Sequence, residues 1–251
     1  MASEQDLITA HQLAAELNLS VDTIWRYSRE KKIPHVELNG KQYRYRLADV
    51  LRALSGTQVN ESTTEYNTGS GRKMTYADYC TLPEEPGYRY EVLDGVLVRD
   101  PSPNVPHQHA ITELYVILRE YFMKKDQEGK IFLAPLDVTL DQHNVIQPDL
   151  FYIPGSGKKM IKFERIDGKP VLVVEVISPS SCRKDRFQKM NIYQKNEIKH
   201  YWLLDPDQKT LECFELRDGL YSMVVGGMEN DIVEHPTFNG LKIDLNLLWW
   251  R

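Results

Sequence analysis

Apolar positions near the N-terminus repeat with the spacing of two short amphipathic helices. Thr9 and Ser20 are suitable N-caps, so the first helix is predicted to begin after Thr9 and the second after Ser20. The positions that face inward follow the helical period. They are Leu13, Ala14 and Leu17 in the first helix, and Val21, Ile24 and Tyr27 in the second.

The next residues change to the pattern of a strand pair. Runs at 36–38 and 42–45 flank Asn39-Gly40, a dipeptide favoured in tight hairpin turns. Pro34 ends the helical region, and a last helix over residues 48–54 offers apolar side chains to the same core. Two helices, a two-stranded wing and a closing helix predict a small winged helix-turn-helix domain over residues 1–54.

Residues 55–73 have no apolar period and are rich in Ser, Thr, Asn and Gly. Such a segment cannot bury enough surface to offset the entropy of ordering it. We therefore predict a flexible linker over residues 55–73, with a second domain over residues 74–251.

The second domain alternates between helical and strand patterns. An apolar stripe predicts its longest helix over residues 110–123, and Asp94-Gly95 predicts a hairpin turn. The core order is helix, three strands, helix, strand, with extra antiparallel strands, which predicts an α/β fold. Further helices are predicted over 76–82 and 184–196, and strands over 88–92, 96–99, 131–140, 145–153, 171–177, 201–204, 211–216 and 220–225.

Composition fits a globular protein of two domains. The chain has 251 residues, of which 41% are hydrophobic and 27% charged, and no apolar run is long enough to span a membrane. The first residues lack the basic start and apolar core of a secretory signal. Cys80, Cys182 and Cys213 are odd in number and far apart, so we expect reduced thiols and a cytoplasmic protein.

Charge is unevenly distributed along the chain. The net charge is −5, yet residues 20–46 hold seven basic and three acidic side chains, a local charge of +4. An acidic protein with one basic stretch usually contacts polyanions through that stretch. A solvated charged surface is the commoner explanation for any single charge run, so the charge alone does not decide.

The first domain resembles the excisionase and MerR-like DNA-binding family. The match runs through residues 9–14 and then Leu19-Ser20-Val21-Asp22-Thr23-Ile24-Trp25-Arg26-Tyr27. The resemblance implies that the second helix enters the major groove and that the wing contacts the backbone or the minor groove. It makes DNA the expected partner, although a protein-docking module is the alternative. It places Asp22, Thr23, Arg26 and Tyr27 near bases, and Lys41 and Arg44 near phosphates.

Two carboxylates stand inside apolar strands of the second domain. Glu175 interrupts the run at 171–177, which is apolar on both faces, and Asp149 lies similarly within 145–153. A buried ionised carboxylate costs several kcal/mol unless it is paired or binds a metal. A turn position for Asp149 and an ion pair for Glu175 are the alternatives. Two such groups on neighbouring strands are typical of a Mg²⁺ site that also uses phosphate oxygens of the substrate.

The same residues resemble the PD-(D/E)XK nuclease pattern. Gln147-Pro148-Asp149 is followed 26 residues later by Glu175 within the expected core order. More narrowly, the domain resembles the Uma-two family, which is classed with the endonucleases. The resemblance implies a restriction-endonuclease-like αβββαβ core. The matching blocks are residues 90–95, 101–103, 107–108, 137–138, 147–149, 174–180, Asp185-Arg186, Lys189, Tyr193 and 201–206.

One position departs from the textual motif. Ile177 stands where the motif has lysine. In the Uma-two pattern the lysine lies on the following helix, which makes Lys189 the candidate. Lys184 competes for the role, but Lys189 shares a predicted helix face with Tyr193. The resemblance also makes Glu91 a candidate further acid, although the polar face of a hairpin is an alternative for this residue.

The combined pattern predicts a DNA endonuclease that uses Mg²⁺ or Mn²⁺. Asp149 and Glu175 would hold the metal, and Lys189 would orient water or neutralise charge in the transition state. His107 and His109 have an H-x-H spacing, but no further Cys/His set accompanies them, which speaks against zinc.

Two other functions remain open from the sequence. The first is a DNA-binding regulator with a catalytically silent nuclease fold, which the missing motif lysine favours. The second is a carboxylate glycosidase, which the DNA-binding module disfavours. The target sequence, the strand preference and the oligomeric state do not follow from the sequence, so a homodimer stays open.

Overall fold

The computed structural model describes residues 7–17, 21–29, 33–38, 42–47, 49–50, 72–83, 85–178 and 181–250, without the side chains of 15, 22, 26, 37, 38 and 42. The chain divides into two compact units, residues 1–62 and 63–251. The predicted boundaries at 54 and 74 remain predictions, because residues 51–71 lie outside the described part. No helix in the described ranges combines the length and apolar character needed to cross a membrane.

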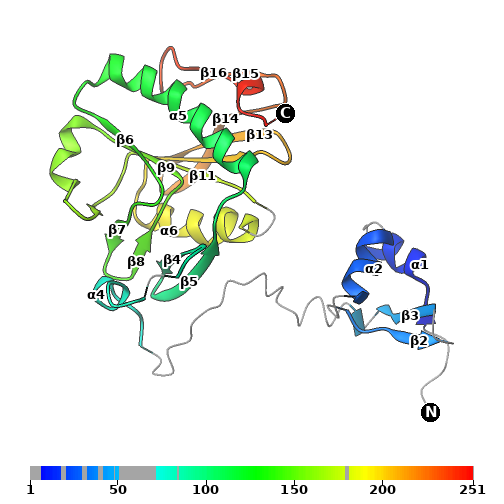
Figure 1. The fold of residues 1–251 in the computed structure, drawn as a ribbon. Helices are drawn as coiled ribbons and strands as arrows, with labels where there is room; N and C mark the ends of the chain where they lie inside the picture. The colour runs from blue at the N-terminus through cyan, green and yellow to red at the C-terminus, as the bar shows by residue number, and fades with distance from the viewer. Residues whose placement is uncertain are drawn as a thin grey trace. The chain divides into compact units, whose positions relative to one another are not determined.

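The described residues of the first unit include the helices α1 and α2 and a three-stranded sheet (Figure 1). The helices are α1 (Ala10–Leu17) and α2 (Val21–Arg29), and the sheet has the order β1-β3-β2. The strands are β1 (Leu7–Ile8), β2 (Val36–Leu38) and β3 (Gln42–Arg46), and both neighbouring pairs are antiparallel. The predicted wing strands are thus present, whereas Asn39-Gly40 and most of the predicted helix at 48–54 lie outside the described residues.

Side-chain caps and a small core hold this unit together. Thr9 Oγ1 accepts a hydrogen bond from the backbone nitrogen of Gln12, as expected of an N-cap. Ser28 Oγ lies 2.8 Å from the hydroxyl of Tyr45, which joins α2 to β3. Leu13, Ala14 and Ile24 are buried as the helical period predicts, together with Ala10, Ile33, Tyr45 and Val50.

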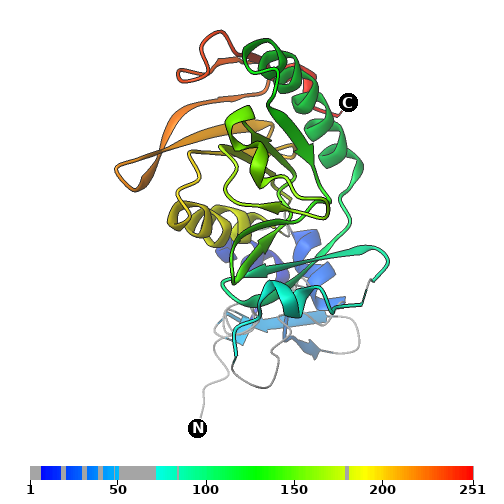
Figure 2. The ribbon, with the colours of Figure 1, turned by 90° about the vertical axis from the view of Figure 1, so that its left-hand side faces the viewer.

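A six-stranded sheet forms the centre of the second unit, with the order β14-β13-β12-β11-β9-β6. Strands β11 and β12 are parallel and the other neighbouring pairs are antiparallel. The hairpin of β13 and β14, orange in Figure 2, projects beyond the rest of the unit. The strands are β6 (Lys130–Leu133), β9 (Leu150–Ile153), β11 (Leu172–Val176), β12 (His200–Asp205), β13 (Thr210–Arg217) and β14 (Leu220–Met228).

A second, five-stranded sheet has the order β10-β7-β8-β4-β5. Strands β4 and β5 form the predicted hairpin, with Asp94 and Gly95 at positive φ in its turn. The strands are β4 (Tyr88–Leu93), β5 (Val96–Pro101), β7 (Val138–Asp141), β8 (Asn144–Ile146) and β10 (Ile166–Asp167). Smaller elements are α4 (Tyr76–Tyr79), η2 (Gly155–Met160), β15 (Ile232–Glu234), β16 (Lys242–Asp244) and η4 (Leu245–Leu247).

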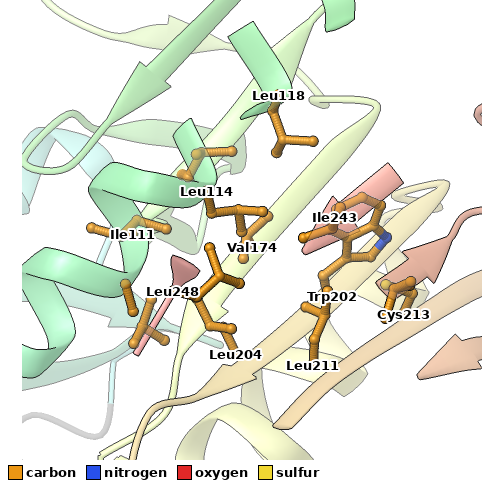
Figure 3. Close-up of a cluster of buried hydrophobic side chains, with 14 of the residues drawn as sticks. Ile111, Leu114, Leu118, Val174, Trp202, Leu204, Leu211, Cys213, Ile243 and Leu248 are labelled. Carbon is orange, nitrogen blue, oxygen red and sulfur yellow. The ribbon is translucent and has the colours of Figure 1, made fainter. Parts of the chain in front are cut away.

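Helices cover both faces of the six-stranded sheet. The long helix α5 (Val105–Lys125) and helix α6 (Met190–Lys195) lie on opposite sides of it (Figure 1). Figure 3 shows Ile111, Leu114 and Leu118 of α5 beside Val174 and Leu204 of the sheet. On the other face, Ile192 and Tyr193 belong to a cluster with Phe151, Val173, Tyr201 and Leu203.

Helix α5 is fixed at both ends. Asn104 accepts a hydrogen bond from the backbone nitrogen of His107 at the N-terminus. At the other end, the carboxylate of Asp126 accepts hydrogen bonds from the Tyr152 hydroxyl at 2.7 Å and from Gly155 N at 2.8 Å. The Tyr152 ring also stacks on Phe122, with 3.8 Å between ring centroids. The helix is therefore tied to β9 and to the segment after it.

The structure corrects three predicted elements. The predicted strand at 131–140 is split into β6 and β7, and the one at 145–153 into β8 and β9. Pro135 and Pro148 stand in the breaks, and proline cannot donate a hydrogen bond to a sheet. The predicted helix at 184–196 begins as a π-helical segment, η3 (Lys184–Lys189), before it continues as α6.

Candidate active site

Three acidic side chains from three strands meet between the two sheets. Glu91 lies on β4, Asp149 directly precedes β9, and Glu175 lies on β11, and all three are buried. Leu150 pairs with Val174 in the antiparallel register of β9 and β11. One further step along both strands brings Asp149 opposite Glu175. Asp149 Oδ2 also accepts a hydrogen bond of 2.9 Å from the backbone nitrogen next to Glu175, that of Val176.

Lys189 joins two of these acids. Its Nζ lies 3.0 Å from Glu175 Oε1 and 2.9 Å from Glu91 Oε1. The hydroxyl of Tyr193 donates a second hydrogen bond, of 2.6 Å, to the same oxygen of Glu175. Lys189 and Tyr193 are both buried, so these contacts are shielded from water. The structure thus brings Glu91, Glu175 and Lys189 of the predicted site together.

Lys184 also reaches this cluster from η3. Its Nζ lies 3.3 Å from Glu91 Oε2 and pairs with the carboxylate of Asp100 on β5. Glu91 additionally accepts a hydrogen bond of 2.8 Å from the backbone nitrogen of Gln147. Glu91 therefore contacts both lysines. Of the two lysines, it is Lys189 that also contacts Glu175.

The π-helical segment explains why both lysines point to one place. Residues five apart in a regular α-helix lie on different faces, but the i→i+5 hydrogen bonding of a π-helix places them above one another. Lys184 and Lys189 are five residues apart and span η3. π-Helical turns are frequent at functional sites.

Asp149 is held by two basic groups, Arg89 and His107. Arg89 Nη1 and Nη2 lie 3.2 and 3.3 Å from Asp149 Oδ1. His107 Nε2, at the start of α5, lies 3.2 Å from Asp149 Oδ2. Arg89 precedes Glu91 by two residues on β4, so both side chains emerge on the same face of that strand.

Acidic groups outnumber basic ones in this buried cluster. Within the described residues, its carboxyl groups are those of Glu91, Asp100, Asp149, Glu175 and Asp185, and all five are buried. Its permanently charged cations are Arg89, Lys184 and Lys189, and His107 is a further basic group. A cluster of this composition carries excess negative charge unless protons or a cation compensate it.

Some carboxyl groups of the cluster bind protons more readily than usual, because the neighbouring cations do not offset the effect of burial. Burial raises the pKa of Glu175 to about 8; Lys189 opposes this rise and the Asp149 carboxylate adds to it. Burial also raises the pKa of Asp100 and of Asp185. Near neutral pH, Glu175 is therefore largely protonated in the metal-free protein.

Glu91 and Asp149 behave in the opposite way. Burial works against their ionisation, but Lys189 and Lys184 hold the pKa of Glu91 below its usual range. The hydrogen bond and charge of His107, followed by the charge of Arg89, do the same for the pKa of Asp149. Glu91 and Asp149 are thus the acids that carry charge in this arrangement.

The two histidines considered for zinc have separate surroundings. His107 contacts Asp149, whereas the His109 ring lies against Trp250, with 5.3 Å between centroids. Across the described ranges, no group of three or more His, Cys, Asp and Glu side chains is arranged to hold a metal ion by itself.

Arg89 and Asp100 were not identified from the sequence, and His107 was not connected with Asp149. A signal existed for Arg89, because it alternates with Glu91 along the predicted strand at 88–92. The contacts of Asp100 and His107 depend on which strands and helix ends become neighbours, and no spacing along the chain gives that information.

The DNA-binding candidates of the first unit are only partly described. Thr23 and Tyr27 lie on α2 and are partly buried, and Arg44 lies on β3. Lys41 lies outside the described residues, as do the side chains of Asp22 and Arg26.

Comparison with known proteins agrees with this division into units. Residues 7–57 match the family model described as "Helix-turn-helix domain". A search of curated proteins gives no match. A crystal structure described as that of "a putative nuclease belonging to DUF820" from Anabaena variabilis is 19% identical, with a TM-score of 0.57. The match covers 70% of this chain and 97% of that one, and shows a shared fold.

The second unit gives the longer match. Residues 76–246 match the Uma2 family model, described as "Putative restriction endonuclease". This range contains every residue of the acidic cluster, from Arg89 to Tyr193. The chain belongs to the Uma2 family.

Proposed function

We propose that the second unit is a metal-dependent DNA endonuclease with a restriction-endonuclease-like αβββαβ core. In this assignment the core consists of α5, β6, β9, β11, the helix formed by η3 and α6, and β12. The observation that carries the proposal is the position of Lys189. Its Nζ lies 3.0 Å from Glu175 Oε1, while Asp149 Oδ2 accepts a hydrogen bond from the backbone nitrogen of Val176, next to Glu175. In this proposal Lys189, from the following helix, takes the role of the motif lysine, at whose position in the sequence Ile177 stands.

The donor set suits a hard divalent cation. Mg²⁺ typically takes one or two protein carboxylates and completes its shell with water and phosphate oxygens. Asp149 and Glu175 would supply these carboxylates, and the excess of acidic groups in the cluster favours a cation there. Structural zinc sites need a larger set of protein ligands, which fits this cluster less well. When bound, Mg²⁺ or Mn²⁺ would supply Lewis acidity to the scissile phosphate and activate water.

Each side chain of the proposed site has a separate role. Asp149 and Glu175 hold the cation, and Lys189 brings a fixed positive charge to the side of Glu175. Charge that is already in place stabilises a transition state without reorganisation. Glu91 keeps the Lys189 ammonium charged and in position. Glu91 therefore acts through Lys189, as a positioning residue.

The helix-turn-helix unit would bring the enzyme to DNA. In the proposed binding mode, α2 enters the major groove with Asp22, Thr23, Arg26 and Tyr27 near the bases. Lys41 and Arg44 of the wing would contact phosphates. The local charge of +4 over residues 20–46 supports this assignment.

Cleavage of DNA by the purified full-length chain tests the proposal. Supercoiled plasmid and labelled oligonucleotides are incubated with Mg²⁺, Mn²⁺ or EDTA. We expect cleavage only with a divalent cation, and its loss in Asp149→Asn and in Glu175→Gln. Wild-type protein that leaves every DNA form intact with both metals would overturn the proposal.

A second function is favoured by one observation. The charged members of the cluster are already paired with basic side chains, and Ile177 at the motif position is buried. A self-compensated cluster could serve as a structural ion-pair network in a DNA-binding regulator. In that case the protein would bind DNA through its first unit and would not cleave it.

A further inference from the structure

A large cavity opens beside Asp149. Its volume is about 890 Å³, within the range of about 300–1,000 Å³ typical of small-molecule sites. Segments from five regions line it: the end of α4 with residues after it, the start of β4, the start of α5 with residues before it, residues 133–137, and residues 147–149. Among its lining residues are Tyr79, Cys80, Tyr88, Arg89, His107 and Gln147.

Two basic side chains flank a carboxylate at one end of the cavity. Arg89 and His107 line this end together with Asp149, and both contact its carboxylate. The side chain of His107 is 9% exposed, and its buried Nδ1 has no hydrogen-bond partner within the described part of the chain. A guanidinium and an imidazole beside each other form a donor pair suited to phosphate oxygens.

The remaining walls combine aromatic rings with polar groups that include the carboxylates of Glu85 and Asp137. Tyr79, Tyr88 and Tyr90 line them. The hydroxyl of Tyr79 and Nε2 of Gln147 both donate to Asp137 Oδ1, at 2.9 and 2.8 Å. Aromatic rings stack on nucleobases, and amide and carboxylate groups read the donors and acceptors at base edges.

We propose that this cavity binds one nucleotide of an unpaired DNA strand next to the scissile phosphate. Arg89 and His107 contact the nucleotide's phosphate, and the tyrosine-lined part receives its base. The inference rests on the proposed function and makes it more specific. A base can enter a cavity of this kind only when it is unpaired or extruded from the duplex. The preferred substrates are therefore single strands, flaps and distorted duplexes.

Cys80 offers a readout that does not depend on cleavage. Its thiol is free and exposed, and it lines the cavity. A bound nucleotide should shield it from a maleimide reagent, with labelling at Cys80 followed by peptide mass spectrometry. The full-length protein is labelled in EDTA with deoxyadenosine monophosphate, deoxyadenosine or inorganic phosphate as the added probe. The Cys80→Ser variant lacks this thiol, so the labelled peptide that it loses is the one that contains Cys80.

We expect the monophosphate to slow labelling by about tenfold at a concentration roughly ten times its Kd. The nucleoside and phosphate alone should bind more weakly, because each uses half of the site. Arg89→Gln and His107→Gln should each raise the Kd of the monophosphate by about tenfold, the loss of one charge-assisted hydrogen bond. Arg165→Gln, a change outside the lining of this cavity, should leave the Kd unchanged.

An unpaired strand and a duplex are then compared on the wild-type protein. A single-stranded oligonucleotide should protect Cys80 more strongly than the same sequence fully paired. Equal protection by both, or none by the monophosphate, would overturn the inference without recourse to any variant. Cleavage with Mg²⁺ is measured on the same preparation. Cleavage without protection rejects the cavity assignment alone, and protection without cleavage rejects the nuclease activity alone.

Discussion

Lys184 and Lys189 both contact Glu91, although five residues separate them along the chain. Their second partners differ, because Lys184 pairs with Asp100 and Lys189 pairs with Glu175. The two lysines therefore share one carboxylate but lie on different sides of it. This difference separates a lysine that contacts a proposed metal ligand from one that does not.

Replacing each lysine by methionine tests the distinction. Lys189→Met should lower the rate of DNA cleavage by about 10²–10³, the loss typical of removing one stabiliser of transition-state charge. Lys184→Met should cost about tenfold or less, because Lys184 pairs with Glu91 and Asp100, neither of which is a proposed metal ligand. DNA affinity, measured by fluorescence anisotropy, should stay unchanged in both. Lys195→Met, an exposed change on the same helix, is the control. Equal losses in Lys184→Met and Lys189→Met would contradict the assignment.

The two proposed metal ligands should differ in their effect on stability. In EDTA near pH 7, Glu175 is largely protonated, so Glu175→Gln replaces a neutral group by a neutral group of similar size. Its free energy of unfolding should change little. Asp149→Asn removes the charge that pairs with Arg89 and His107, and should cost about 1–3 kcal/mol. Urea unfolding measures both variants against the wild type. A larger loss in Glu175→Gln than in Asp149→Asn would show that Glu175 is ionised in the metal-free fold.

Substitutions in the first unit should separate base contacts from phosphate contacts. Arg26→Ala should weaken binding to a selected target more than binding to random DNA. Lys41→Ala should weaken binding to both and lower the salt dependence of log Kd by about one unit. Binding is measured over a range of salt concentrations, with Lys195→Ala in the second unit as control. If both variants bind DNA with the same affinity as the wild type, the first unit would instead be a protein-docking module.

Two buried histidines predict a pH dependence of stability. Burial lowers the pKa of His200 and of His235 to about 4, while an unfolded histidine titrates near 6.5. The unfolded state binds more protons between these values, so stability is full above about pH 6.5 and falls as the pH drops towards 4. Glu215, whose pKa is lowered to about 2, adds a loss only below its unfolded value.

Urea unfolding of the Glu175→Gln protein between pH 7.5 and 5 measures this slope outside the range where Glu215 titrates and without the opposing titration of Glu175, whose pKa is raised to about 8. His200→Phe should reduce the slope, because it removes one of the two protonation sites and replaces an imidazole packed against Phe238 by another ring. His11→Gln, an exposed change in the first unit, should leave the slope unchanged. A slope that His200→Phe leaves unchanged would show that His200 is not buried in its neutral form.

The sequence was sufficient for the elements whose pattern is local. The helix α5 and the hairpin turn at Asp94 follow from periodicity and turn residues, and both are present. The carboxylates Asp149 and Glu175 stood out because apolar residues surround them, and burial is what such surroundings predict. Lys189 became a candidate through the family resemblance, since Ile177 breaks the textual motif.

Other features depend on tertiary neighbours and could not be read from the sequence. Breaks at Pro135 and Pro148 divide two predicted strands between two different sheets, which decides what lies beside Glu91. The π-helical turn at η3 has no pattern of apolar residues that distinguishes it from an α-helix. The contact of His107 with Asp149 joins a helix end to a strand end 42 residues away.

The hydrogen bonds of Asp126 fix the C-terminal end of α5, the helix that packs on one face of the six-stranded sheet. With 21 residues the helix is about 31 Å long, and His107 stands near one end while Asp126 and Tyr152 grip the other. The two ends thus belong to one continuous helix, in which the contact of His107 with Asp149 and the contacts of Asp126 with Tyr152 and Gly155 are about 31 Å apart.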